Sequence, residues 1–106
     1  MRRGRRRRGG QGRIPRPVFI KHFPETTMFT PIPHTGKEPV QLEHAELEVL
    51  RLVDLEDLSQ EEAGEAMGIS RGTIWRLLHR GRRKITLSLV EGRPLEIMPS
   101  EKIEKS

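Results

Sequence analysis

Apolar side chains recur at helical spacing in the second half of the chain, from Gln41 onward. The first such segment predicts a helix from about Glu43 to Leu55. One arc of this helix is apolar and contains Leu42, Ala45, Val49, Leu50, Leu52 and Val53. The polar residues expected outside this arc are Glu43, His44, Glu48, Arg51 and Asp54.

Two further helices are predicted from their end signals. Ser59 and Glu62 have the spacing of a capping box, and Gly68 supplies the left-handed residue that ends this second helix at about Met67. Ser70 is the expected N-cap of a third helix, from Arg71 to about Leu89. Its predicted buried arc contains Ile74, Leu77, Leu78, Gly81, Ile85, Ser88 and Leu89.

The remaining segments lack this periodicity. Residues 1–12 are almost entirely Arg and Gly, which predicts a disordered tail. Six of the eight prolines lie between Arg13 and Pro39, so residues 13–40 are predicted to form an extended arm. Within this arm, Val18–Ile20 is a β-prone run that could pair with 95–98 as a two-stranded ribbon. Residues 99–106 are expected to fray.

The second and third predicted helices have the residue types of a helix-turn-helix. Ala63 and Gly64 supply small residues where the two helices approach closely, and Gly68 tolerates the positive φ of the turn. The helices would be held together by the apolar residues Met67, Ile69, Ile74 and Leu77. We therefore predict a mainly α fold with a three-helix helix-turn-helix domain at 41–98; the alternative is a generic three-helix bundle. A mid-helix glycine at Gly81 is expected to pack closely against the first helix.

Charge is strongly segregated, although the net charge is only +5. Residues 1–24 carry nine bases and no acid, residues 25–70 carry eleven acids against two bases, and residues 71–94 carry seven bases and one acid. Two basic blocks around an acidic one are typical of a protein that binds a polyanion. Alternatively, an acidic and a basic helix complement each other within the bundle.

The exposed face of the third helix is the candidate DNA-binding surface, because a recognition helix enters the major groove with its first turns nearest the bases. Arg71 and Arg76 can bind guanine or phosphate in bidentate fashion, and Gly72 brings bare backbone near the DNA. Trp75 could contact a thymine methyl, stack on a flipped base, or pack under the N-terminal segment or a second subunit. The bases further along are expected on phosphates. The complete set is Arg71, Gly72, Thr73, Trp75, Arg76, His79, Arg80, Arg82, Arg83 and Lys84.

These residues resemble those of an uncharacterised prokaryotic family of predicted DNA-binding proteins. The resemblance lies in 47–55 (LEVLRLVDL), 60–63 (QEEA) and 67–78 (MGISRGTIWRLL), with further similarity in 12–17 (GRIPRP), 81–85 (GRRKI) and 90–93 (VEGR). It implies a helix-turn-helix similar to region four of the sigma-70 factors, in a transcription regulator. Many members carry cysteines after the Pro-Arg start; residues 18–24 contain none here, so a metal or redox role does not carry over.

Several other classes are disfavoured by composition. The absence of cysteine excludes disulfides and thiolate zinc sites, and a small domain without disulfides fits the cytosol best. No apolar run approaches the roughly 20 residues of a membrane span. The four histidines are scattered, and His44 and Glu48 are expected to be a solvated pair rather than metal ligands. We therefore expect neither an enzyme nor a cofactor or metal site.

Three questions of partnership stay open at this level. Domains similar to sigma region four can also bind polymerase or antagonist proteins, and the Arg-rich tail could bind a structured RNA by charge. A small ordered core and a single recognition helix favour a homodimer. Its contacts would come from the strand segments or from Leu87, Leu89 and Val90.

Overall fold

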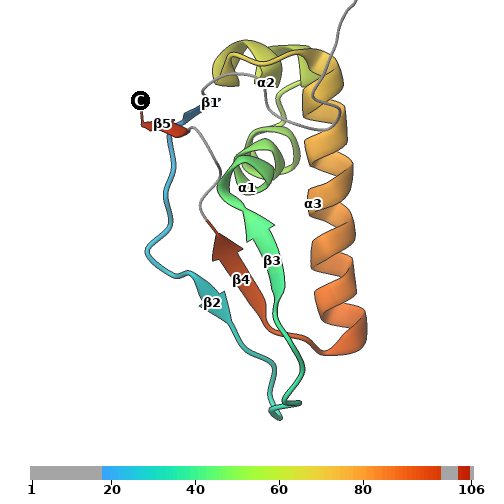
Figure 1. The fold of residues 1–106 in the computed structure, drawn as a ribbon. Helices are drawn as coiled ribbons and strands as arrows, with labels where there is room; N and C mark the ends of the chain where they lie inside the picture. The colour runs from blue at the N-terminus through green and yellow to red at the C-terminus, as the bar shows by residue number, and fades with distance from the viewer. Residues whose placement is uncertain (1–17, 99–102, 106) are drawn as a thin grey trace, which may run out of the picture.

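The computed structural model describes residues 18–98 and 103–105. Helix α3 (Arg71–Glu91) runs along one side of α1 (His44–Leu50), the small sheet lies beside the C-terminal half of α3, and α2 (Gln60–Met67) packs near the N-terminal end of α3 (Figure 1). The predicted mainly α class is confirmed, with more β structure than expected. The tail predicted at 1–12, the Pro-Arg start at 12–17, and residues 99–102 and 106 lie outside the described residues. In chain order the elements are β1 (Val18–Ile20), β2 (Met28–Phe29), β3 (Val40–Glu43), α1 (His44–Leu50), the π-helical segment η2 (Arg51–Leu55), α2 (Gln60–Met67), α3 (Arg71–Glu91), β4 (Leu95–Met98) and β5 (Ile103–Lys105).

The helix ends follow the local sequence signals. Ser59 Oγ accepts a hydrogen bond from the Glu62 amide at 3.0 Å, and the Glu62 carboxylate accepts one from the Ser59 amide at 2.8 Å. Gly68, at φ 72°, ends α2, and Ser70 Oγ accepts from the Thr73 amide at the start of α3. These predictions are confirmed. Helix α3 continues two residues beyond Leu89, until Gly92 takes the left-handed conformation.

The first predicted helix consists of three different elements. Val40–Glu43 is a strand, so Leu42 lies in β3 rather than on a helical arc. The α-helix begins at His44, and its last turn widens into η2, where the Glu56 amide donates to the Arg51 carbonyl at 2.9 Å. Alternation in β3 buries Val40 and Leu42 while Gln41 is exposed. The sequence pattern was ambiguous because Leu42 satisfies both a strand period and a helix period.

The predicted pairing of Val18–Ile20 with 95–98 is wrong. Strand β4 is the central strand of a sheet in the order β2-β4-β3, parallel to β3 and antiparallel to β2. The parallel register brings Leu95 opposite Val40 and Ile97 opposite Leu42, so that apolar residues of both strands face the helices. Strand β1 pairs instead with β5, in a stretch that we expected to fray.

The core lies between the helices and the inner face of the sheet, and two glycines permit its closest approaches. A Cβ at Gly64 would lie 2.7 Å from the Ile69 carbonyl oxygen, and one at Gly81 would lie 2.9 Å from Leu50 Cδ1. The predicted role of Gly81 against the first helix is confirmed, whereas the closest approach to Gly64 comes from the turn before α3, with Ile74 Cγ1 of α3 at 3.7 Å. The expected burial of Leu89 is wrong, because this side chain is 77% exposed. Ser88 occupies the inward position on that turn, and the next residue is rotated by about 100° away from the core.

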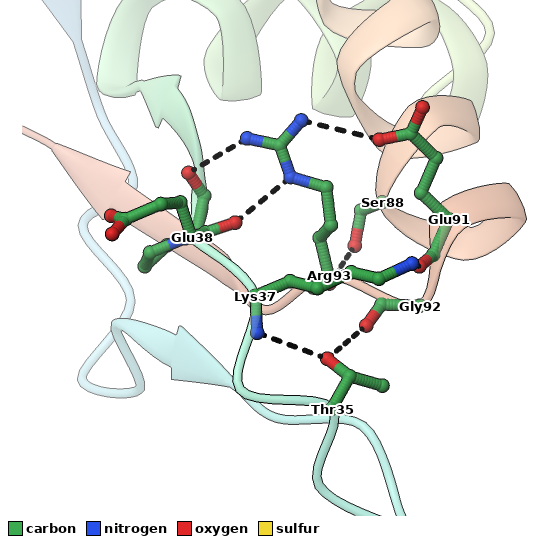
Figure 2. A network of polar contacts seen from close by, with 8 residues as sticks. Thr35, Lys37, Glu38, Ser88, Glu91, Gly92 and Arg93 are labelled. Atoms are coloured by element: carbon green, nitrogen blue, oxygen red, sulfur yellow. Dashed lines mark hydrogen bonds and ion pairs between the residues drawn. The ribbon is translucent and has the colours of Figure 1, made fainter.

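The proline-rich arm is attached to the C-terminal end of α3 by a polar network (Figure 2). Thr35 Oγ1 donates to the Gly92 carbonyl and Lys37 Nζ to the Glu91 carbonyl, each at 2.7 Å. Arg93 Nε donates to the Glu38 carbonyl at 2.8 Å. Thr35 and Lys37 thus satisfy carbonyl groups that the end of a helix leaves without partners, whereas Arg93 binds a carbonyl group of the arm. The arm is thereby held against the end of the helix opposite to the candidate DNA-binding residues.

Candidate nucleic-acid interface

The N-terminal half of α3 exposes the residues that the sequence assigned to DNA. Ile74, Leu77 and Leu78 are buried against α1 and α2, which turns the opposite side of the helix outward. This separation of a buried and an exposed side is confirmed. The exposed side, from the first turn onward, presents Arg71, Gly72, Trp75, Arg76 and His79.

Gly72 and Thr73 shape the first turn. A Cβ placed on Gly72 would find no atom nearer than Arg76 Nη1 at 3.9 Å, so the backbone here is accessible. Thr73 is 8% exposed, and its Oγ1 hydrogen-bonds Ser70 Oγ at 2.9 Å and accepts from Arg76 Nη2 at 3.3 Å. Thr73 therefore orients Arg76 rather than presenting its own side chain.

Trp75 and His79 form a stacked aromatic pair on this exposed side. Their ring centroids are 3.9 Å apart with an interplanar angle of 29°, and His79 Nδ1 lies 3.0 Å from the Trp75 carbonyl oxygen. The indole is 51% exposed. The pair presents an aromatic surface on the same exposed side of α3 as Arg71 and Arg76.

Three of the more distal bases are engaged by acids of α1 and η2. Glu46 Oε1 lies 2.8 Å from Lys84 Nζ, and Glu46 Oε2 lies 3.3 Å from Arg80 Nε. Arg82 forms a two-point pair with Asp54, at 2.6 and 3.1 Å. The Arg82 hydrogen bonds hold the pKa of Asp54 below its ordinary value, and the same bonds raise the pKa of Arg82. The complementary acidic and basic helices considered from the sequence are therefore present along this half of α3.

A second basic feature lies between α3 and β3. A hollow of about 500 Å³ there is lined by four basic side chains and by Gln41 of β3, among other residues. Sequence reasoning did not single out Arg93, which follows α3 and reaches this hollow only because β4 pairs with β3. The four bases are Arg80, Arg83, Lys84 and Arg93.

The proposed solvated pair of His44 and Glu48 is wrong. The Glu48 side chain is 2% exposed and its carboxylate accepts hydrogen bonds from Arg51 at 3.0 and 2.8 Å and from the Lys21 amide at 3.1 Å. Burial favours a higher pKa for Glu48, but these hydrogen bonds and the charge of Arg51 outweigh it and lower the pKa. His44 packs edge-to-face on Phe23, and burial lowers its pKa. Within 18–98, no three His, Asp or Glu side chains cluster in a way that could hold a metal ion.

Comparison with known proteins places the chain in a family. The model of the DUF134 family, described as proteins of unknown function, matches residues 1–104. A UPF0251 protein of Pyrococcus furiosus is 48% identical over 95 residues, which cover 87% of this chain and 88% of the relative. A UPF0251 protein of Archaeoglobus fulgidus is 39% identical over 95 residues, covering 90% of each chain.

No solved structure matches significantly. Among the described helices, none is both long enough and apolar enough to span a bilayer. The resemblance to an uncharacterised prokaryotic family is confirmed, and the chain belongs to the DUF134 family of proteins of unknown function.

Proposed function

We propose that this protein is a sequence-specific double-stranded DNA-binding protein that regulates transcription in the cytoplasm. In this proposal α2 and α3 form a helix-turn-helix similar to region four of the sigma-70 factors, and α3 enters the major groove. The observation that carries the proposal is the first half of α3, where Arg71, Gly72 and Arg76 are exposed and residues 71–81 contain no acid.

The chemistry of that surface suits a duplex. Arginine can bind guanine O6 and N7 through its planar fork, and the Thr73 hydroxyl holds Arg76 near the start of the helix. The amides at the start of α3 carry the positive end of the helix dipole, which favours phosphate. Arg83 and the hollow beside β3 lie further along the helix and can follow the phosphate backbone.

The position of β1 supports a contribution from the Arg-rich segment. A Cβ at Gly68 would lie 3.0 Å from Phe19 Cδ2, so β1 sits beside the turn between α2 and α3. The described chain begins at Val18, beside this turn, and the sequence before it contains eight arginines. Their charge would add affinity that does not depend on sequence.

We infer a homodimer as the binding species. A single recognition helix covers few base pairs, and dimers solve this by binding two half-sites. Leu89 and Val90 are 77% and 78% exposed at the end of α3, where a second copy or an RNA polymerase subunit could cover them. Sedimentation of the full chain at several concentrations distinguishes a dimer from a monomer.

Selection from a randomised duplex pool tests the proposed function. The full chain is titrated by fluorescence anisotropy with the duplex pool and with a structured RNA, at low and near-physiological salt, and the bound DNA is sequenced. Enrichment of a defined site whose binding survives the higher salt supports the proposal. Equal binding of both nucleic acids that collapses as salt rises would instead indicate the Arg-rich segment acting alone, and would favour a protein partner for α2 and α3.

A further inference from the structure

An apolar hollow of about 390 Å³ lies between the inner face of the sheet and the helices. Its buried lining includes Leu42 of β3, Leu50 of α1 and Ile97 of β4. Two exposed side chains also line it: Phe29, which is 54% exposed, and Leu55, which is 75% exposed. This volume lies within the usual range for small-molecule sites, which are mostly apolar with a few polar groups that orient the ligand.

Three polar side chains line this hollow, and each can donate a hydrogen bond. They are His22, Thr26 and Arg51, and no acidic residue lines the hollow. Each of them can donate a hydrogen bond and none is an anion, so a carboxylate would complement them in hydrogen bonding and would match the charge of Arg51. The composition of the lining therefore favours an apolar ligand with one anionic end.

One nitrogen of the Arg51 guanidinium, Nη1, can exchange its hydrogen-bond partner. Its Nε and Nη2 bind the buried carboxylate of Glu48, which fixes the guanidinium in place. Its Nη1 binds Glu56 at 3.2 Å, and the Glu56 side chain is 51% exposed. An exposed ion pair contributes little stability, so another carboxylate can replace Glu56 at small cost.

We propose that this hollow binds a small organic monocarboxylate with an apolar body. The body lies among Leu42, Leu50 and Ile97, and the carboxylate takes the place of Glu56 on Arg51 Nη1. Both Arg51 and Leu55 belong to η2, and π-helical turns are frequent at functional sites. Asp54 of the same segment holds Arg82 of α3, so occupancy of the hollow would act on α3; this regulatory consequence rests on the proposed DNA-binding function.

Direct binding of a matched pair of probes tests the site without DNA. The probes are 4-phenylbutanoate and its neutral analogue 4-phenylbutan-1-ol, titrated into the full chain by calorimetry. We expect saturable binding of the acid at least about tenfold tighter than that of the alcohol. Absence of saturable binding at millimolar concentration would overturn the site, and equal binding of acid and alcohol would overturn the role of Arg51.

Three variants locate the site on the structure, with circular dichroism as the check on folding. Leu55→Gln should weaken binding of the acid about fivefold or more. Ile32→Gln is the matched control, because Ile32 is also an exposed apolar residue but does not line the hollow, and it should have no effect on binding of the acid. Glu56→Gln removes the competing carboxylate and should tighten binding of the acid alone. Equal weakening by Leu55→Gln and Ile32→Gln would contradict the assignment, whatever the outcome of the DNA selection.

Discussion

Glu46 of α1 and Lys84 of α3 are joined by hydrogen bonds of 2.8 and 3.0 Å, although the glutamate side chain is only 1% exposed. The same carboxylate accepts from the Glu43 amide at 3.0 Å and lies 3.3 Å from Arg80 Nε. A buried carboxylate is tolerated when its oxygens are paired in this way. Glu46 therefore links the start of α1 to the middle of α3, where Gly81 lets the two helices approach.

Removal of this charge should destabilise the fold. In Glu46→Gln, Lys84 and Arg80 lose their buried counter-charge, and an unpaired cation near the core is costly. We expect a loss of about 2 kcal/mol in the free energy of unfolding, below the usual cost of a broken buried pair because Lys84 is 29% exposed and can reach solvent. Urea denaturation followed by circular dichroism measures it.

A double-mutant cycle separates the ion pair from general disruption. Glu46→Gln combined with Lys84→Met removes both partners, so it should cost clearly less than the sum of the two single changes. Simple addition of the single effects would show that Glu46 and Lys84 do not stabilise each other.

The parts of the fold that sequence reasoning found are those set by neighbouring residues. The capping of α2 by Ser59 and its end at Gly68 depend on contacts within one helical turn. Strand pairing depends on partners distant in the chain, and β4 pairs with β3 rather than with β1. Leu89 shows a similar limit, since a helical period cannot tell where the core that covers the helix ends.

The same distinction between local and long-range contacts applies to the candidate site. The exposed side of α3 was predictable, because Ile74 and Leu77 fix which side faces inward. The pairing of Arg82 with Asp54, the place of Arg93 beside α3, and the apolar hollow were not, because each requires the relative positions of elements. The arrangement of Trp75 against His79 lies between these cases: their spacing of four residues permits stacking, but several rotamers satisfy that spacing.

The arginines at the start of α3 should determine sequence preference if the proposed function is right. Arg71→Ala or Arg76→Ala should weaken binding to the selected site by about 1–3 kcal/mol for an arginine that reads a base, with little change on random DNA. Arg83→Ala is the control: it should weaken binding to all sequences alike and reduce the salt slope by about one. Unchanged specific affinity in both Arg71→Ala and Arg76→Ala would rule out α3 as the reading helix.

Release of Arg82 from its acidic partner should strengthen general DNA binding. Asp54→Asn removes the 2.6 Å ion pair and frees one cation on α3. The salt dependence of binding to random DNA should steepen by up to about one unit of slope, while stability falls by less than about 1 kcal/mol, because the pair is exposed.

Asp57→Asn provides the matched control for that experiment. It makes the same charge change at an exposed residue with φ 63°, a conformation that asparagine also accepts. If the two variants alter the salt slope equally, the effect of Asp54→Asn comes from net charge alone and Arg82 does not contact the duplex.

Two glycines of the α2–α3 region should respond to alanine in opposite ways. Gly64→Ala would place a Cβ 2.7 Å from the Ile69 carbonyl oxygen, so the turn between α2 and α3 must shift, at a cost of about 1–3 kcal/mol. Gly72→Ala meets nothing closer than 3.9 Å and should stabilise α3 by up to about 1 kcal/mol.

Because the added methyl group would face the duplex, Gly72→Ala should nevertheless weaken DNA binding. Thermal unfolding and anisotropy titration of both variants check this, and stronger DNA binding by Gly72→Ala would show that the backbone there is not approached.

Stability should decline in mildly acidic solution because of His44. Neither ring nitrogen has a hydrogen-bond partner among the described residues, and burial lowers the pKa below its ordinary value of 6.5. The unfolded chain therefore binds a proton at this position more readily than the folded chain. The contribution of neutral His44 to the free energy of unfolding is fully present above pH 6.5. It is lost as the pH falls below that value toward the lower pKa of His44 in the folded state.

Urea unfolding at about pH 7.5 and about pH 5.5 measures this loss of stability, in a pH range above the ordinary pKa of Glu48. His44→Phe, which keeps an aromatic ring against Phe23, should flatten this dependence; the same decline in the variant would assign the proton to another group.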